Sequence, residues 1–136
     1  MGVGGVVIEN ERALLIRRGS APLLGEWSIP GGMLEVGETI SEGVQRELFE
    51  ETAVEVKVLD LIEVFERVTR DEDGRSKYHF VILDYLCEVV SGEPRAGSDV
   101  TDVAWAAESD LAGYSLTPTA TRVLQKAFQM ARVRES

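Results

Sequence analysis

The sequence contains a single cysteine and a single histidine among its 136 residues. One cysteine excludes an internal disulfide, and Cys87 lies in an apolar run that favours an inert thiol in the core. The scarcity of both residue types excludes a zinc site of clustered histidines and cysteines. His79 begins an apolar segment, where a structural role is expected ahead of a catalytic one. The sequence also lacks the P-loop pattern and the EF-hand calcium loop.

Positive charge is scarce as well, because 14 Lys and Arg stand against 24 Asp and Glu, for a formal net charge of −10. Nucleic-acid polymers and anionic membranes both require a basic surface, so neither is expected as a partner. A small phosphorylated substrate is not excluded, since a bound divalent cation reverses the local potential. The first residues lack the basic start and long apolar stretch of a signal peptide, and a cytoplasmic location is expected.

The length and the 44% hydrophobic fraction predict one domain over residues 1–136. Strands are predicted at residues 2–9, 13–18, 25–29, 54–65, 80–90 and 100–106, with a solvated hairpin loop at 67–77. The segment 80–90 is nearly continuous in apolar residues, which is typical of a strand buried on both faces. Together with two helices, these strands predict a mixed sheet that is covered by helices on its faces.

Both helices have clear start signals in the sequence. Thr39 and Glu42 form a capping box, which predicts a helix from about residue 40 to about residue 52. Thr117 as N-cap, followed by Pro118 at the first helical position, predicts a final helix near the C-terminus.

Three carboxylates lie on the first of these helices. Successive helix positions turn by about 100°, so Glu47, Glu50 and Glu51 fall within an arc of roughly 100° on one face. Like charges at this spacing repel, and the helix C-terminus disfavours negative charge. A solvated face with salt bridges is the ordinary alternative for such a run. A hard divalent cation bound by these oxygens removes both conflicts, so the pattern predicts a metal site.

The spacing around these carboxylates resembles the signature box of the Nudix hydrolases. Gly32 is followed after five residues by Glu38, and after seven more by the run RELFEE at residues 46–51. The family pattern is G-x5-E-x7-R-E-U-x-E-E-x-G-U, where U is a bulky aliphatic residue. Ala53 stands where the pattern has its second glycine. Glycine adopts left-handed conformations more easily than alanine, but the difference at this position removes no metal ligand.

The resemblance implies a Nudix-type α/β/α sandwich with a mixed sheet, and hydrolysis of a nucleoside diphosphate linked to another moiety. It implies a site for Mg²⁺, with Mn²⁺ as an alternative, whose ligands are Glu47, Glu50, Glu51 and the carbonyl of Gly31. The proton acceptor is either Glu47 or a loop carboxylate. The resemblance also implies that Arg46 orients a carboxylate. Glu38 holds the loop or contacts the metal through water, and Glu38 and Gly32 are expected among the substrate-binding residues.

Three candidates lie outside the box, each with a plain structural alternative. Arg18 ends the second strand, where family members can present an arginine to phosphate, although it is also an ordinary charged strand end. Trp27 lies close to the site, and either packs in the core or stacks on a base or sugar. Asp99 precedes Trp105 by six residues, which is similar to the position of an extra metal ligand or base in some Nudix enzymes. The alternative for Asp99 is a turn residue.

The substrate is less well defined than the reaction. The segment WSIPGG at residues 27–32 and the acidic approach to Trp105 resemble small proteins grouped with ADP-ribose pyrophosphatases. ADP-ribose or a related nucleoside diphosphate sugar is therefore the first expectation. The alternatives are a MutT-like enzyme that cleaves nucleoside triphosphates, including damaged ones, and a sensor that binds nucleotide without cleaving it. Homodimers are common in the family, and the apolar first strands are candidates for such an interface.

Overall fold

The computed structural model of the protein describes residues 1–20, 24–70 and 72–135. In chain order its elements are β1 (Gly2–Glu9), β2 (Arg12–Arg18), β3 (Trp27–Ser28), β4 (Gly31–Met33), α1 (Ile40–Thr52), β5 (Glu55–Arg70), β6 (Ser76–Ser91), β7 (Val100–Ala107), the 3₁₀ helix η1 (Glu108–Tyr114) and α2 (Pro118–Glu135). No helix in these described ranges is long and apolar enough to cross a membrane.

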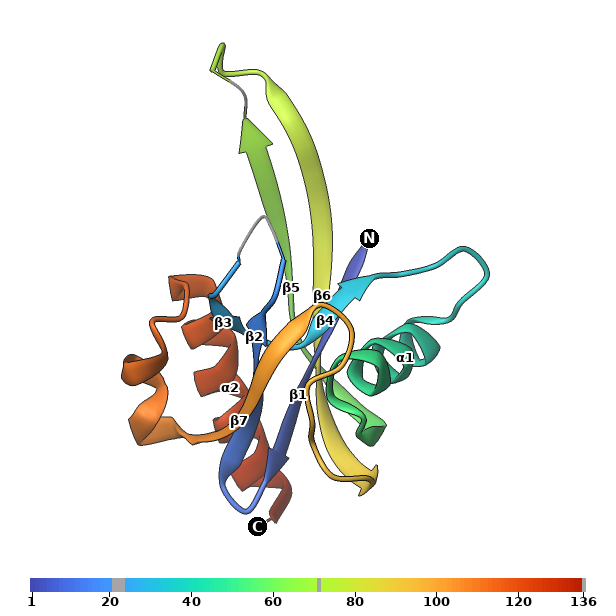
Figure 1. Ribbon diagram of the computed structural model, residues 1–136, viewed down its shortest axis with the longest axis vertical. Coiled ribbons are helices and arrows are strands. Elements are labelled where there is room, and N and C mark those ends of the chain that lie inside the picture. Colours follow the sequence, from blue (N-terminus) through green and yellow to red (C-terminus); the bar gives the residue numbers. More distant parts are fainter. Residues whose placement is uncertain (21–23, 71, 136) are drawn as a thin grey trace.

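Strand β1 lies at the centre of a mixed sheet with the order β3-β2-β1-β6-β5. It runs parallel to β6 and antiparallel to its other partners. On the side away from β6, β4 pairs with residues 2–4 of β1 and β2 pairs with residues 8–9, so the sheet divides along β1. Helices α1 and α2 lie on opposite sides of this sheet (Figure 1). The predicted α/β/α sandwich is confirmed.

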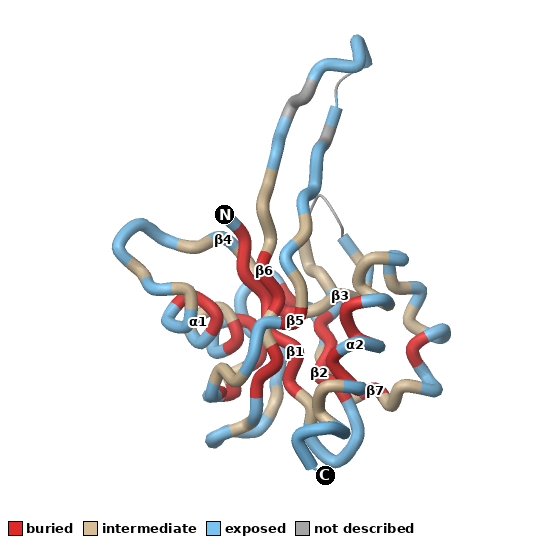
Figure 2. The backbone as a smooth tube through the Cα atoms, turned by 180° about the vertical axis from the view of Figure 1, so that it is seen from behind, coloured by how far each residue is buried: buried red, intermediate tan, exposed pale blue. Residues whose placement is uncertain are grey.

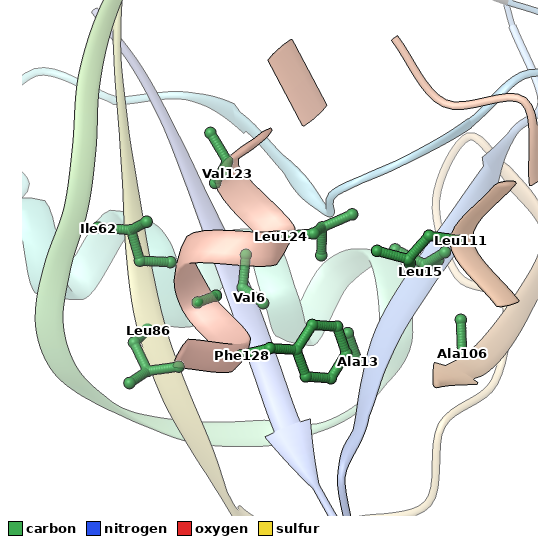
Figure 3. Packing of buried hydrophobic residues seen from close by; sticks show 11 residues of the cluster. Val6, Ala13, Leu15, Ile62, Leu86, Ala106, Leu111, Val123, Leu124 and Phe128 are labelled. Atoms are coloured by element: carbon green, nitrogen blue, oxygen red, sulfur yellow. The ribbon is translucent and has the colours of Figure 1, made fainter. Parts of the chain in front are cut away.

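The two faces of the sheet carry two separate hydrophobic clusters. Val6 of β1 packs with Leu124 and Phe128 of α2, together with residues of β2, β5 and β6 (Figure 3). Val3 and Val7 pack in the other cluster, with residues of α1. All three β1 valines are at most 2% exposed. The apolar first strands are therefore covered within one chain, and the expectation that they supply a dimer interface was wrong.

Helix α1 begins and ends where the sequence predicts. The Thr39 side chain accepts a hydrogen bond from the Glu42 backbone at 3.2 Å, and the Glu42 carboxylate accepts one from the Thr39 backbone at 2.9 Å. Ala53 ends the helix in a left-handed conformation, with φ 62°. Alanine thus adopts the geometry that the family pattern assigns to glycine, at a modest cost in backbone strain.

The segment between β6 and β7 closes the C-terminal end of α1. Backbone N–H groups of Arg95, Gly97 and Ser98 donate to the carbonyls of Thr52, Glu51 and Glu50 at 2.9–3.0 Å. A fourth carbonyl, that of Phe49, accepts from the Ala53 N–H at 2.9 Å. The last four carbonyls of a helix lack partners within the helix, and here all four are satisfied. This docking fixes the carboxylate-bearing turn to a second part of the chain.

Four segments differ from the predictions. The charged tract 67–77 is mostly strand, because β5 extends to Arg70 and β6 begins at Ser76, although Asp71 lies outside the described residues. The outer part of this β5–β6 hairpin is largely exposed and extends beyond the sheet (Figure 2). The segment 80–90 is buried on both faces only in part, since Val90 is 63% exposed. Strand β4 and the 3₁₀ helix η1 were not predicted.

Candidate active site

The carboxylates of α1 differ strongly in exposure. The Glu51 residue is 7% exposed, whereas the side chains of Glu47 and Glu50 are 12% and 46% exposed. Burial of a carboxylate is costly unless it is paired or bound to a metal. The face predicted from the sequence thus changes from buried to open over one helical turn, with Glu51 innermost.

Glu51 connects α1 to β4. Its Oε1 accepts a hydrogen bond from the Gly31 N–H at 2.8 Å. Burial raises the pKa of Glu51 to about 7, although the hydrogen bond from Gly31 opposes the shift. The negative charge of Glu47 raises this pKa further, and the charges of Arg18 and Asp99 also act on it, in opposite directions. All of these predicted site residues therefore lie close enough to Glu51 to influence its proton affinity.

Glu47 lies directly over Gly32. A Cβ atom at Gly32 would come within 2.6 Å of all three atoms of the Glu47 carboxyl group. Any side chain at this position would therefore displace the carboxylate, so the glycine of β4 leaves the room that Glu47 occupies. Burial raises the pKa of Glu47, and the hydrogen bond from Arg46 lowers it. The absence of a side chain at Gly32 is therefore required for the observed position of the Glu47 carboxylate.

Arg46 donates hydrogen bonds to three carboxylates and to the backbone of β4. Its Nε and Nη2 donate to the two oxygens of Glu38 at 2.5 and 3.0 Å. Its Nη1 donates to Glu47 at 2.9 Å and to Glu50 at 3.3 Å, and Nη2 also donates to the Met33 carbonyl at 2.9 Å. A planar guanidinium suits such multiple contacts. Arg46 therefore determines where Glu47 and Glu50 point.

Glu38 lies in the loop before α1, and its side chain is only 13% exposed to solvent. The hydrogen bond from Arg46 lowers the pKa of Glu38, and the Glu35 N–H, which donates to Glu38 at 3.0 Å, lowers it as well. In this arrangement Glu38 fixes the loop and Arg46 to each other.

A hard divalent cation fits the donors at this site. All of them are oxygens, and among the described residues the buried Glu51 carboxylate has one hydrogen-bond donor for its two oxygens. Within the described ranges, no three acidic, histidine or cysteine side chains are already placed as ligands of a single ion. The reason is visible in the contacts, because Arg46 binds Glu47 and Glu50 while Gly31 binds Glu51.

A cavity of about 300 Å³ opens beside Gly31 and Gly32, and we refer to it as the β4 cavity. Its lining includes Arg18 of β2 and Trp27 of β3. The Arg18 Nε is buried and has no hydrogen-bond partner among the described residues. Trp27 packs edge-on against Tyr114, with ring centroids 5.1 Å apart, so it both contacts the core and lines the cavity.

Two other predicted positions lie on loops or outer strands. Asp99 is exposed, has a φ of 57°, and its carbonyl accepts from the Gly19 N–H at 2.8 Å. His79 lies on the outer hairpin, is paired with Glu66 at 2.5 Å, and takes no part in the site.

A larger cavity of about 490 Å³, lined by Phe128 and residues near the end of α2, contains none of the predicted site residues.

Two residues near the site were missed by sequence reasoning. Asp84 of β6 is 4% exposed and lines the β4 cavity. Its signal is a charged residue inside the apolar run 80–90, a run that by itself predicts only a buried strand. Gly97 packs against the last turn of α1, where a Cβ would overlap the Glu50 carbonyl oxygen. Nothing in the local sequence distinguishes Gly97 from an ordinary loop glycine.

Comparisons with known proteins show the family of this chain. The family model described as NUDIX domain matches residues 1–127. An ADP-ribose pyrophosphatase of Methanocaldococcus jannaschii is 35% identical over 102 residues, which are 75% of this chain and 58% of that relative. The nucleoside triphosphatase NudI of Escherichia coli K12 is 30% identical over 88% of this chain and 90% of NudI.

A solved structure also matches. The MutT NUDIX hydrolase from Burkholderia pseudomallei superposes with a TM-score of 0.79 at 31% identity, covering 92% of this chain and 95% of that protein. The archaeal relative is therefore matched over little more than half of its length, whereas NudI and the solved structure are matched almost throughout.

Proposed function

The chain belongs to the NUDIX hydrolase family, and from this membership we propose that it hydrolyses the pyrophosphate bond of a nucleoside diphosphate linked to a second moiety. The observation that carries the proposal is the position of Glu51. This carboxylate is buried, has a pKa raised to about 7, and is bonded to a backbone that also lines the β4 cavity. Perturbed carboxylates beside a cavity are typical of functional sites.

We assign the cation to Glu47, Glu50, Glu51 and the carbonyl of Gly31, with Mg²⁺ as the first choice and Mn²⁺ as the alternative. When bound, the cation neutralises phosphate charge and makes the phosphorus accessible to water. Arg46 positions the carboxylates. Either Glu47 or Asp99 accepts the proton of the attacking water.

The substrate we propose is ADP-ribose or a related nucleoside diphosphate sugar. The β4 cavity combines an aromatic residue, Trp27, with the buried and unpartnered Nε of Arg18. Arginine suits phosphate, and an aromatic side chain suits a base or sugar, so the lining matches a nucleotide. The archaeal relative named ADP-ribose pyrophosphatase supports this choice. We place Gly32 and Glu38 at the edge of the same site, next to the cation.

A nucleoside triphosphate, cleaved to a monophosphate and pyrophosphate, is the second candidate. It is favoured by the match to NudI, which extends over 90% of that nucleoside triphosphatase. The two candidates share the cation site and differ in the group beyond the second phosphorus. We propose that residues 1–136 form one domain and that the protein is cytoplasmic. We also propose a homodimer, and analytical ultracentrifugation tests this oligomeric state.

Turnover of a substrate panel tests the proposal. The panel contains ADP-ribose, other nucleoside diphosphate sugars, diadenosine polyphosphates and nucleoside triphosphates, assayed with Mg²⁺ and then Mn²⁺. We expect AMP and ribose 5-phosphate from ADP-ribose, with the highest kcat/KM of the panel. Reaction in ¹⁸O-water followed by mass spectrometry of both products identifies the attacked phosphorus. Binding of nucleotides without turnover of any compound would overturn the proposal and favour a sensor.

A further inference from the structure

Asp84 is a buried carboxylate that none of the proposed catalytic steps uses. It is 4% exposed and lies on β6 between apolar residues of the same strand. Among the described residues its carboxylate makes no hydrogen bond and no ion pair. Burial removes most of the hydration of a carboxylate, which is destabilising unless hydrogen-bond donors replace the lost water. Such a residue is expected where a ligand supplies the missing donors.

The neighbouring strand leaves space for this side chain. In the parallel pairing of β1 with β6, Gly4 is the partner of Asp84 and Gly2 is the partner of Ile82. A Cβ atom at Gly4 would overlap the Asp84 Oδ1. Two residues further along, the same face carries Val6 and Leu86, which α2 covers as part of the core. The glycines thus open the β4 cavity at the point where the core ends.

The pKa of Asp84 is raised but stays below neutral pH, so the ionised carboxylate is an acceptor of hydrogen bonds there. Burial raises its pKa to about 6, the charge of Glu63 raises it further, and the charge of Arg67 lowers it. Glu63 is the cross-strand partner of Asp84, and Arg122 of α2 binds Glu63 with two donors. Glu63 therefore has its own partner, and within this cross-strand pair Asp84 is the residue that lines the β4 cavity.

The β4 cavity is lined by charged residues of both signs, the cations Arg18 and Arg67 and the anions Glu26 and Asp84. Arg18, with an unpartnered Nε, is electrostatically coupled to the cation-site residue Glu51, whereas Asp84 is coupled to Glu63 and Arg67 of β5. Between them the lining is aromatic and apolar, with Trp27 and Phe80 among its members. A nucleotide has matching chemistry, since its phosphates are anionic and its base combines a planar ring with N–H donors.

We propose that Asp84 is a specificity-determining residue that accepts a hydrogen bond from the exocyclic amino group of an adenine base in the β4 cavity. This inference rests on the proposed function, because it takes the phosphates to lie toward Arg18 and the cation site. A base without an amino donor leaves the carboxylate buried and unpaired, so the cavity disfavours it. Asp84 thus separates bases that carry an amino donor from bases that lack one, and it leaves the moiety beyond the second phosphorus unspecified.

Equilibrium binding of two nucleoside monophosphates tests this inference without turnover, since neither contains a pyrophosphate bond. AMP and purine riboside 5′-monophosphate differ only in the amino group at position 6 of the base. We expect the wild-type protein to bind AMP at least about 10-fold more tightly by calorimetry, as hydrogen bonds to charged groups typically allow. In Asp84→Leu the ratio is expected to fall to about one. Asp84→Asn retains an acceptor and is expected to keep part of the preference.

Glu63→Gln is the matched control, because it changes the adjacent carboxylate on the same face and is expected to leave the ratio unchanged. Absence of AMP binding, a wild-type ratio near one, or an unchanged ratio in Asp84→Leu would overturn the inference. A loss of discrimination between AMP and 2′-deoxy-AMP in Asp84→Leu, with the amino preference intact, would also overturn it by assigning Asp84 to the sugar. If the substrate panel shows no hydrolysis while these ratios hold, the proposed reaction fails and the base assignment stands.

Discussion

The Gly31 N–H donates a hydrogen bond of 2.8 Å to the Glu51 carboxylate, and this contact joins β4 to the last turn of α1. It places the proposed carbonyl ligand and the innermost carboxylate on two rigid elements that are bonded to each other. Functional groups are positioned most accurately when they lie on helices and strands and are held by further hydrogen bonds. At Glu51, the hydrogen bond that supports the fold requires only an acceptor oxygen, whereas cation binding requires the negative charge. Stability and activity can therefore be tested separately at this residue.

Glu51→Gln is expected to lower kcat and to leave the folded structure intact. The glutamine carbonyl still accepts the Gly31 hydrogen bond, but the charge that binds the cation is lost. Loss of a preorganised electrostatic group typically reduces kcat by roughly 10²–10³. The metal-free variant is expected to melt at the wild-type temperature or above it, because a buried charge with a raised pKa has been removed. Steady-state kinetics and thermal unfolding measure both effects. Glu88→Gln, on an exposed position of β6, is the control.

Arg46→Lys is expected to reduce activity although the positive charge is kept. Lysine presents one ammonium group and does not reproduce the simultaneous contacts to Glu38, Glu47 and Glu50. Residues that orient metal ligands typically account for about 10- to 100-fold in metal affinity or activity. Titration with Mg²⁺ during turnover measures the metal affinity. Arg134→Lys, which alters an exposed ion pair with Asp60, provides the comparison, and equal activities of the two variants would contradict a positioning role for Arg46.

Arg18→Ala is expected to raise KM by about 10-fold or more and to lower kcat less. Its buried Nε has no partner among the described residues, so a substrate phosphate is the group that we expect to accept from it. An interaction that is equal in the ground state and transition state affects KM alone. The adjacent Arg17→Ala is the matched control, because Arg17 Nε donates to the Gly25 carbonyl at 3.0 Å. An unchanged KM in Arg18→Ala would remove Arg18 from the site.

Helix α1 could be predicted from the sequence with both of its ends, because its signals are local. Thr39 and Glu42 are three residues apart and satisfy each other's backbone donors. The three box glutamates follow from the same helical period. Their different burial could not be predicted, since it depends on β4 and on the segment that docks at the end of α1. Glu51 is innermost because Gly31 lies against it, and no local pattern contains that information.

Strand β4 and the long β5–β6 hairpin show the opposite case. Gly31–Met33 has little intrinsic β-propensity, and it is a strand because residues 2–4 of β1 pair with it. The charged tract 67–77 has the composition of a loop, yet the register of β5 with β6 continues to the pair Arg70 and Ser76. Pairing between distant segments outweighs local preference in both places. The position of Asp84 could not be predicted for the same reason, because the space for its side chain depends on Gly4 of the neighbouring strand β1.

Gly97→Ala is expected to destabilise the protein by about 1–3 kcal/mol, the usual range for overpacking. A Cβ at Gly97 would overlap the carbonyl oxygen of Glu50, so the segment that closes the end of α1 must move. The Gly97 N–H donates to the Glu51 carbonyl at 3.0 Å, and this bond is expected to weaken with the movement. Urea unfolding measures the free energy. Gly113→Ala is the control, since beyond its local backbone no heavy atom of the described residues lies within 4 Å of its added Cβ.

Asp84→Asn is expected to stabilise the protein at pH 8 and to have little effect at pH 4. The pKa of Asp84 is about 6 in the folded protein against an ordinary value of 3.8, so the folded state binds this proton more tightly than the unfolded state. Stability is therefore lost as the pH rises from about 4 to about 6, and the pKa difference corresponds to about 3 kcal/mol. Asparagine does not ionise, so the difference between variant and wild type should grow over this pH range and then level off. Chemical unfolding of both proteins at several pH values measures it. A difference that is the same at pH 4 and pH 8 would contradict a raised pKa at Asp84, and Glu88→Gln controls for the loss of one negative charge.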